Sequence, residues 1–114
     1  MIAVIFEVLP HETERDTYFS IAASLGPELE KIPGFISIER FESITTPGKI
    51  LSLSFWKDEE SVRQWRNIEG HRLAQHTGRE QVFRDYRLRV AHVLRDYGMM
   101  NRDEAPADSR HMNS

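Results

Sequence analysis

The chain has 114 residues, of which 39% are hydrophobic and 29% are charged, and its formal net charge at pH 7 is −3. This length suits one domain, and the absence of cysteine excludes a disulfide framework, thiolate metal ligands and a cysteine nucleophile. No apolar run approaches the roughly 20 residues that span a bilayer and the start lacks a basic leader, so we expect a cytoplasmic protein with no membrane partner.

The chain begins with a predicted strand and a predicted helix. Apolar residues fill most positions from Ile2 to Leu9, which is the pattern of a strand with two largely apolar faces. From Thr13 to Ile32 apolar residues recur at spacings of three and four, as in a helix, and threonine is a common N-cap. Gly26 and Pro27 predict a kink or a restart of this helix, because proline lacks an amide donor and clashes with the preceding turn.

A predicted antiparallel hairpin follows. Its strands are Phe35 to Ile44 and Lys49 to Trp56, and the segment Thr45-Thr46-Pro47-Gly48 joins them with the turn chemistry of proline and glycine. Strict alternation places Ile36 and Ile38 on one face of the first strand. In the second strand one face is wholly apolar and consists of Leu51, Leu53 and Phe55.

The next segment predicts two helical stretches and a last strand. Asp58 is expected to cap a helix that ends at Gly70, with acidic residues in its first turn, where the helix dipole favours them. A second helical stretch is expected over residues 71–83, weakened by Gly78. Strict alternation then predicts a strand over residues 85–96.

The predicted order β-α-β-β-α-β is that of an α+β, ferredoxin-like domain with a four-stranded antiparallel sheet and helices on one face. We assign this domain to residues 1–98. Residues 99–114 show no periodicity and are predicted to form a mobile tail without a fold of its own. Because the first strand is apolar on both faces, we expect a second copy of the chain to cover the open face of the sheet, giving a homodimer.

The candidate site residues cluster around the second predicted helix. The sequence contains no glycine-rich phosphate loop, nucleophile elbow or HExxH motif. It does place Trp65, His71, Arg72 and His76 within twelve residues. His71 and His76 are five positions apart, about 140° around a helix, so they cannot easily share a metal ion, and we predict no metal site. Trp65 lies on the apolar stripe, where it fits either a core role or the wall of a pocket for a flat substrate.

Three roles are open for His76, which lies four residues after Arg72 and four before Glu80. It can serve as an axial haem ligand, as a proton donor near neutral pH, or as a surface residue in a polar ladder. His71 follows Gly70 and fits a helix start equally well.

Basic residues are concentrated late in the chain. Residues 63–95 contain eight arginines and three acids, a net charge of +5, whereas residues 1–62 carry −6. Such a stretch is compatible with solvated surface arginines, an anionic ligand, or an acidic surface on a partner copy. Arg87, Arg89 and Arg95 alternate on one strand face but have no aromatic residues between them on that face, so we do not expect nucleic acid as a partner.

Three segments together resemble the antibiotic biosynthesis monooxygenase (ABM) family of dimeric α+β barrels. They are Ile32-Pro33-Gly34-Phe35-Ile36-Ser37, Leu53-Ser54-Phe55-Trp56-Lys57-Asp58, and Val62-Arg63-Gln64-Trp65 followed by His71 and His76. The resemblance covers about residues 1–98. It implies two chains closing a barrel and a pocket between helices and sheet in each subunit.

The resemblance implies one of two chemistries. Some members oxidise polyketide-type phenols to quinones with O₂ and no metal or flavin, whereas others bind and open haem with an Asn-Trp-His set. Trp65 and His76 resemble the last two members of that set, but the first strand reads Ile5-Phe6-Glu7-Val8 and lacks the asparagine.

Our first hypothesis is therefore a cofactor-independent monooxygenase acting on a small aromatic or polyphenolic substrate. Trp65 would line the pocket, His76 or His71 would transfer a proton, and Arg72 would hold an anionic oxygen. The alternatives are a haem-binding or haem-degrading protein with His76 as ligand, and a non-enzymatic dimer that binds a small ligand.

Overall fold

The computed structural model describes residues 1–75 and 82–112, together with the side chains in these ranges except those of residues 70–75 and 110–112. The elements in chain order are β1 (Ile2–Pro10), the 3-10 helix η1 (Glu12–Glu14), α1 (Arg15–Glu30), β2 (Phe35–Glu42), β3 (Ile50–Trp56), α2 (Glu59–Gln75), β4 (Phe83–His92) and α4 (Ala107–Met112).

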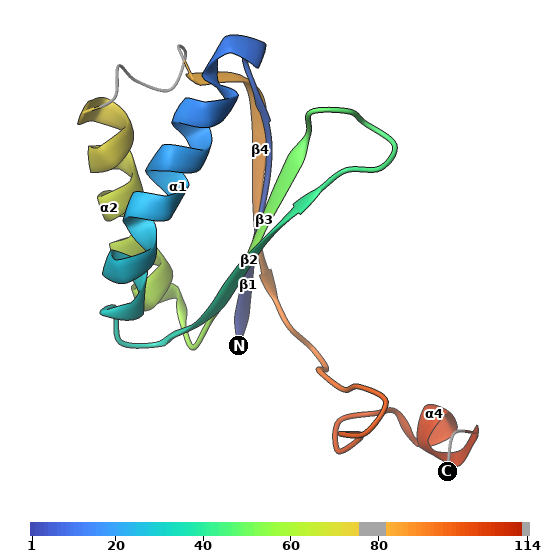
Figure 1. The fold of residues 1–114 in the computed structure, drawn as a ribbon. Helices are drawn as coiled ribbons and strands as arrows, with labels where there is room; N and C mark the ends of the chain where they lie inside the picture. Colours follow the sequence, from blue (N-terminus) through green and yellow to red (C-terminus); the bar gives the residue numbers. More distant parts are fainter. Residues whose placement is uncertain (76–81, 113–114) are drawn as a thin grey trace.

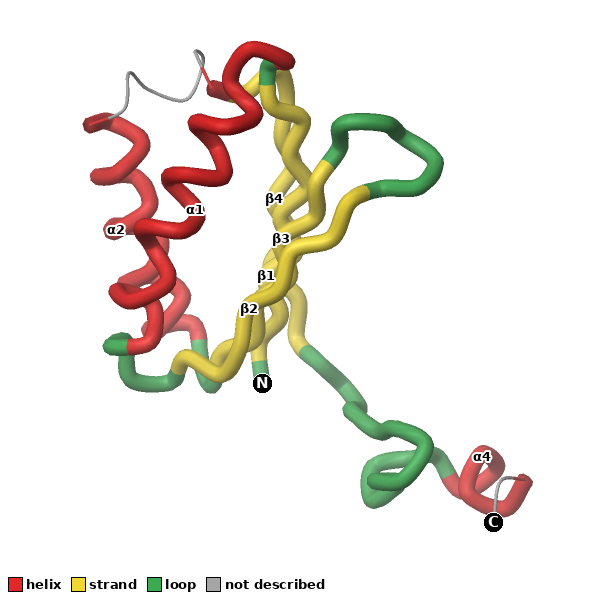
Figure 2. Tube along the Cα trace, in the orientation of Figure 1, coloured by secondary structure: helices red, strands yellow, loops and turns green. Residues whose placement is uncertain are grey.

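The four strands form one antiparallel sheet in the order β2-β3-β1-β4. At its centre, Ile5 of β1 lies opposite Leu53 of β3 and Arg89 of β4. Helices α1 and α2 cover one face of the sheet, and the other face is open along its whole length (Figures 1 and 2). The predicted ferredoxin-like α+β fold is confirmed.

The core lies between the helices and the covered face of the sheet. It is built from alternate residues of the strands and the apolar stripes of both helices, including Val4, Phe6, Val8, Leu25, Leu29, Ile50, Trp56, Val62 and Trp65. On β3 the covered face also contains two buried serines, Ser52 and Ser54, and the indole Nε1 of Trp56 donates a hydrogen bond to Ser54 Oγ at 2.9 Å. The wholly apolar face of β3 is therefore the open one.

Strand β2 contains a bulge that the alternation pattern did not predict. Phe35 lies opposite Trp56, yet Ser37 lies opposite Phe55, so Ile36 is an extra residue in the ladder. Ile36 is 53% exposed. The prediction that Ile36 and Ile38 share a face was wrong, because one inserted residue shifts the phase of the strand that follows it.

Both helices run through positions where the sequence predicted interruptions. Helix α1 continues past Pro27 as one helix, so no restart occurs there, and its buried residues Leu25 and Leu29 flank the proline. Helix α2 continues through Gly70 to Gln75 instead of ending there. A glycine inside a helix costs only about 1 kcal/mol relative to alanine, which packing against the sheet can offset.

Strand β4 begins and ends earlier than predicted. Its last residue, His92, lies opposite Ile2, the first residue of β1, so no neighbouring strand remains to extend the ladder. Beyond this pair, the Val93 N–H donates one more hydrogen bond to the carbonyl oxygen of Met1, at 3.0 Å. The sheet therefore stops where its partner strand starts.

The tail leaves the sheet edge and extends away from the domain (Figure 1). It contains the short helix α4, which the loss of periodicity did not predict. Arg102 organises this segment, since its guanidinium donates to the carbonyl oxygens of Gly98 and Ser109 at 3.1 and 3.3 Å. That the tail is mobile, and that the domain ends at residue 98, stay predictions.

Candidate functional site

A small cavity of about 20 Å³ lies between the two helices and the covered face of the sheet. Every strand and both long helices contribute to its wall, which consists of Phe6, Tyr18, Ile21, Ala22, Leu25, Arg40, Ser52, Trp65, Glu69 and Phe83. The wall is mostly apolar. This volume is close to the roughly 10–15 Å³ that one water molecule needs and far below the roughly 300–1,000 Å³ of ligand sites, so a ligand would enter only as the wall side chains move apart.

Trp65 both packs in the core and lines the cavity, so the two roles predicted for it are combined. It is 3% exposed, and its ring centroid lies 6.2 Å from that of Trp56. Trp56 is fully buried and is not part of the cavity wall. Trp65 therefore offers an indole surface to a ligand from a rigid position.

Three polar side chains from different elements meet in this apolar wall: Tyr18 of α1, Arg40 of β2 and Glu69 of α2. Burial raises the pKa of the Tyr18 hydroxyl above its usual value, and the charge of Glu69 raises it further. The Arg40 guanidinium acts in the opposite direction through its charge and a hydrogen bond to Tyr18. Because burial is the largest effect, the phenol stays protonated at neutral pH.

None of these three polar residues was among the site residues predicted from the sequence, and Arg40 is the one whose position differs most from expectation. Its Nε atom is buried and has no hydrogen-bond partner among the residues that the structure describes. Its position opposite Ser52 places it on the covered face of the sheet. A charged residue in a strand suggests a solvent-facing position, and the alternation with Ile38 was the only available signal that Arg40 faces inward.

The predicted catalytic residues lie beyond the described part of the site. His71 and Arg72 belong to the last turns of α2, where the backbone is described but the side chains are not. His76 lies outside the described residues. Their proposed roles are therefore untested, as is the choice between the two histidines.

Among the side chains that the structure describes, in residues 1–69 and 82–109, no group of three or more histidine, cysteine, aspartate or glutamate residues could hold a metal ion. Within residues 1–75 and 82–112, no helix has the length and apolar character needed to cross a membrane.

The chain belongs to the antibiotic biosynthesis monooxygenase family. The family model of that description matches residues 1–77, which is more than half of the chain. The predicted family is thereby confirmed.

A relative with a known activity is similar to this chain in amino-acid sequence. The jasmonate monooxygenase ABM of Pyricularia oryzae is 53% identical over 93 residues, which is 82% of this chain and 43% of that protein. The chain thus spans less than half the length of this relative.

Solved structures show the same fold at low sequence identity. SnoaB of Streptomyces nogalater, described as a cofactor-independent oxygenase, superposes with a TM-score of 0.66 at 12% identity, over 83% of this chain and 94% of SnoaB. A mutant of MhuD with two manganese protoporphyrin IX molecules bound per active site superposes with a TM-score of 0.65 at 18% identity, over 86% and 99% of the two chains. At these identities the likeness concerns the fold alone.

Proposed function

We propose that this domain is a monooxygenase that oxidises a small, largely apolar organic molecule with O₂ in the cavity lined by Trp65. One observation carries this proposal: a mostly apolar cavity contains a few converging polar groups, Tyr18, Arg40 and Glu69, within a domain of a monooxygenase family. A non-enzymatic binding protein would need the same cavity, so turnover is the property to test.

The first substrate class is an aromatic or polyphenolic compound that reacts without a metal, a flavin or haem. In an anthrone-like substrate, a methylene group between aryl rings is oxidised to a carbonyl. The balance is CH₂ plus O₂ giving C=O plus H₂O, so the substrate supplies all the electrons. The protein must then assist removal of a proton and stabilise the resulting anion.

In this proposal different side chains bind the ring, accept the proton and hold the anionic oxygen. Trp65 forms the wall against which a flat ring stacks. His76 or His71 accepts the proton, and Arg72 holds the anionic oxygen, as the family resemblance implies. Haem chemistry with His76 as ligand is the alternative, although the described cavity wall contributes no histidine.

The relative from Pyricularia oryzae favours a second substrate class, jasmonates, for this chain. Insertion of one oxygen atom into a C–H bond of such a molecule consumes O₂ and two electrons and releases water. Those electrons must come from an external donor such as a reduced nicotinamide. The two substrate classes therefore differ in whether turnover needs a reductant.

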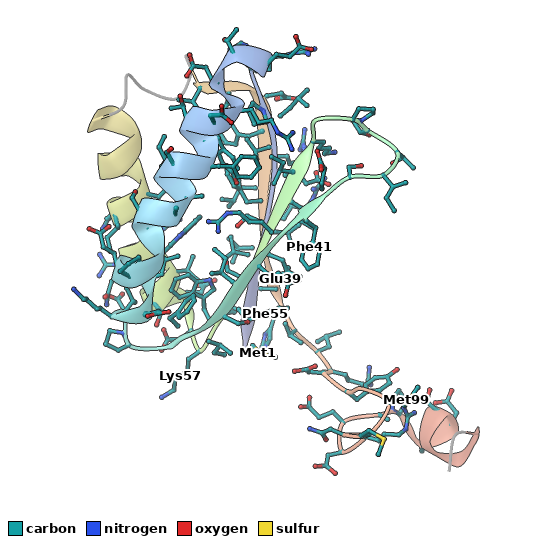
Figure 3. All side chains as sticks on the ribbon, in the orientation of Figure 1. Met1, Glu39, Phe41, Phe55, Lys57 and Met99 are labelled. Atoms are coloured by element: carbon teal, nitrogen blue, oxygen red, sulfur yellow. The ribbon has the colours of Figure 1, made fainter. Side chains whose placement is uncertain are left out.

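We also propose that the domain works as a homodimer whose two open sheet faces meet. The open face carries a contiguous apolar set consisting of Ile5, Leu9, Phe41, Leu51, Leu53 and Phe55. Phe41 projects from this side of the sheet (Figure 3). A monomer rarely leaves so much contiguous apolar surface in water, whereas a second copy would bury it symmetrically.

Oxygen uptake with product analysis tests the enzymatic proposal. The purified protein is incubated in chelator-treated buffer with an anthrone, or with jasmonate plus NADPH, under ¹⁸O₂. We expect a product with one labelled oxygen atom, and at least a tenfold lower rate for Trp65→Ala. Ile44→Ala is the matched control, since Ile44 is 98% exposed in the hairpin loop and far from the cavity wall. Inactivity across both substrate classes would favour the binding protein instead.

A further inference from the structure

We propose that Arg40 and Tyr18 form a subsite for a carboxylate, so that the ligand of this cavity is a small apolar molecule with one carboxylate group. This inference rests on the proposed use of the cavity as the ligand site. It adds the chemical class of the ligand and names a residue that recognises it.

The unpaired donor of Arg40 is the first argument. A guanidinium has five N–H donors in a fixed planar arrangement, and a carboxylate can bind two of them at once. In this structure Nε is buried and has no partner among the described residues. A buried donor without a partner destabilises the structure, and more so when it is charged, so a ligand acceptor placed there would relieve that cost.

The second argument is the state of Tyr18. Its pKa is raised by burial, so the phenol keeps its proton at neutral pH. The Arg40 guanidinium, whose charge opposes this rise, has only donors, so the phenol proton remains available to an acceptor on the ligand. Arg40 and Tyr18 together therefore present two kinds of donor to one anionic group.

Glu69 opposes an anion in the same cavity. It is the one acidic side chain of the described wall, and it already takes part in an interaction of its own. The single positive charge of Arg40 can balance one negative charge on the ligand, and the carboxylate of Glu69 repels a second. This balance favours a monocarboxylate over a dianion.

The rest of the wall fits the apolar part of such a ligand. Phe6, Ile21, Leu25, Trp65 and Phe83 surround the space beside the two donors. An ester of the same acid keeps the shape and the apolar area but loses the charge. Comparison of an acid with its ester therefore isolates the proposed subsite from general hydrophobic binding.

Isothermal titration calorimetry at pH 7.5 tests the inference with two matched pairs: jasmonate with methyl jasmonate, and 1-naphthylacetate with its methyl ester. We expect the wild-type protein to bind at least one acid ten or more times more tightly than its ester. Arg40→Gln should reduce this preference to less than twofold by weakening the acid alone. Arg40→Lys should retain part of it, because lysine keeps the charge but not the planar donor arrangement.

Arg66→Gln is the matched control, since it removes the same charge from an exposed position of α2 outside the cavity wall. Circular dichroism confirms that each variant is folded. Equal affinity for acid and ester in the wild type, absence of binding by both acids, or an unchanged preference in Arg40→Gln overturns the inference. Acid-selective binding without any oxygen uptake would support the subsite while the monooxygenase proposal failed.

Discussion

Gly34 and Ser61 pack so closely that a β-carbon on Gly34 would overlap Ser61 Oγ. The same hydroxyl oxygen lies 2.5 Å from the carbonyl oxygen of Pro33 and 2.8 Å from Asp58 Oδ1. This contact fixes the first turn of α2 against the loop that leads into β2. Because α2 carries Trp65 and Glu69 and β2 carries Arg40, it also sets the distance between two walls of the cavity.

Substitution of Gly34 should therefore be costly. Gly34 has φ +93°, in the region that only glycine adopts readily, so Gly34→Ala adds about 1–3 kcal/mol of backbone strain to the overlap with Ser61. We expect a lower free energy of unfolding in urea and weaker ligand binding. Gly26→Ala is the control: nothing lies within 4 Å of the added carbon, and a helical alanine should stabilise by about 0.5–1 kcal/mol. Equal stability of the two variants would contradict this view of the contact.

The cap of α2 predicts a specific pH dependence. Hydrogen bonds from the Ser61 amide, and then from its hydroxyl, lower the pKa of Asp58 below its usual 3.8. Stability from this carboxylate is complete above that value and is lost as the pH falls through the lower folded pKa.

Asp58→Asn keeps a capping oxygen but cannot titrate. We expect the difference in Tm between wild type and Asp58→Asn to be largest above about pH 5 and to shrink at lower pH. Glu7 also has a lowered pKa, but it titrates equally in both proteins and cancels in the difference. The pKa of Glu60 is lowered mainly by Arg63 but is raised by the charge of Asp58, so the comparison is made with Glu60→Gln in both proteins. A difference in Tm that is constant with pH would remove Asp58 from this role.

Disruption of the open face should separate the dimer. Leu53 lies at its centre, opposite Ile5 and Glu39, so Leu53→Asp places a charge in the proposed interface. Light scattering coupled to size-exclusion chromatography should show a wild-type dimer and a monomeric variant at micromolar concentration. Ile44→Asp, in the exposed hairpin loop, should remain dimeric. A monomeric wild-type protein would refute the proposed assembly.

Ligand binding should change the fluorescence of Trp65 more than that of Trp56. Trp65 lines the cavity and Trp56 does not. When jasmonate, which has no aromatic ring, is titrated in, Trp56→Phe should keep the change in fluorescence and Trp65→Phe should lose most of it. The reverse pattern would place the ligand elsewhere.

Haem titration distinguishes the two chemistries of the family. If the domain is cofactor-independent, the Soret band of added haem should show no saturable shift. A stoichiometric shift that His76→Ala abolishes would overturn the cofactor-independent proposal and support haem binding.

The order of the elements was predictable because each carries its own local pattern. Alternation on β1 and β4 and the acidic first turn after Asp58 are read from neighbouring residues alone. The continuity of α2 through Gly70 was not predictable in this way, because a glycine lowers helix stability by only about 1 kcal/mol and does not by itself decide where a helix ends. Trp65 could be predicted from its stripe and its family resemblance.

Arg40 could not be identified with the same means. Nothing in the sequence shows that the serine-containing face of β3 is the buried one, since Ser52 and Ser54 resemble surface residues next to Leu51 and Leu53. Which face of the sheet is covered is decided only when the helices pack against it. That packing, which no local pattern encodes, is what places Arg40 on the covered face.

The extra residue at Ile36 has a consequence for how such a cavity can change. If Ile36 instead paired with Phe55, Phe35 would keep its place while every later side chain of β2 moved to the opposite face. Arg40 would then leave the ligand and join the surface proposed for the second copy, and Glu39 and Phe41 would turn inward. Deletion of Ile36, by contrast, would leave Arg40 opposite Ser52, so the bulge allows β2 to lose a residue here without losing the charged side of the cavity.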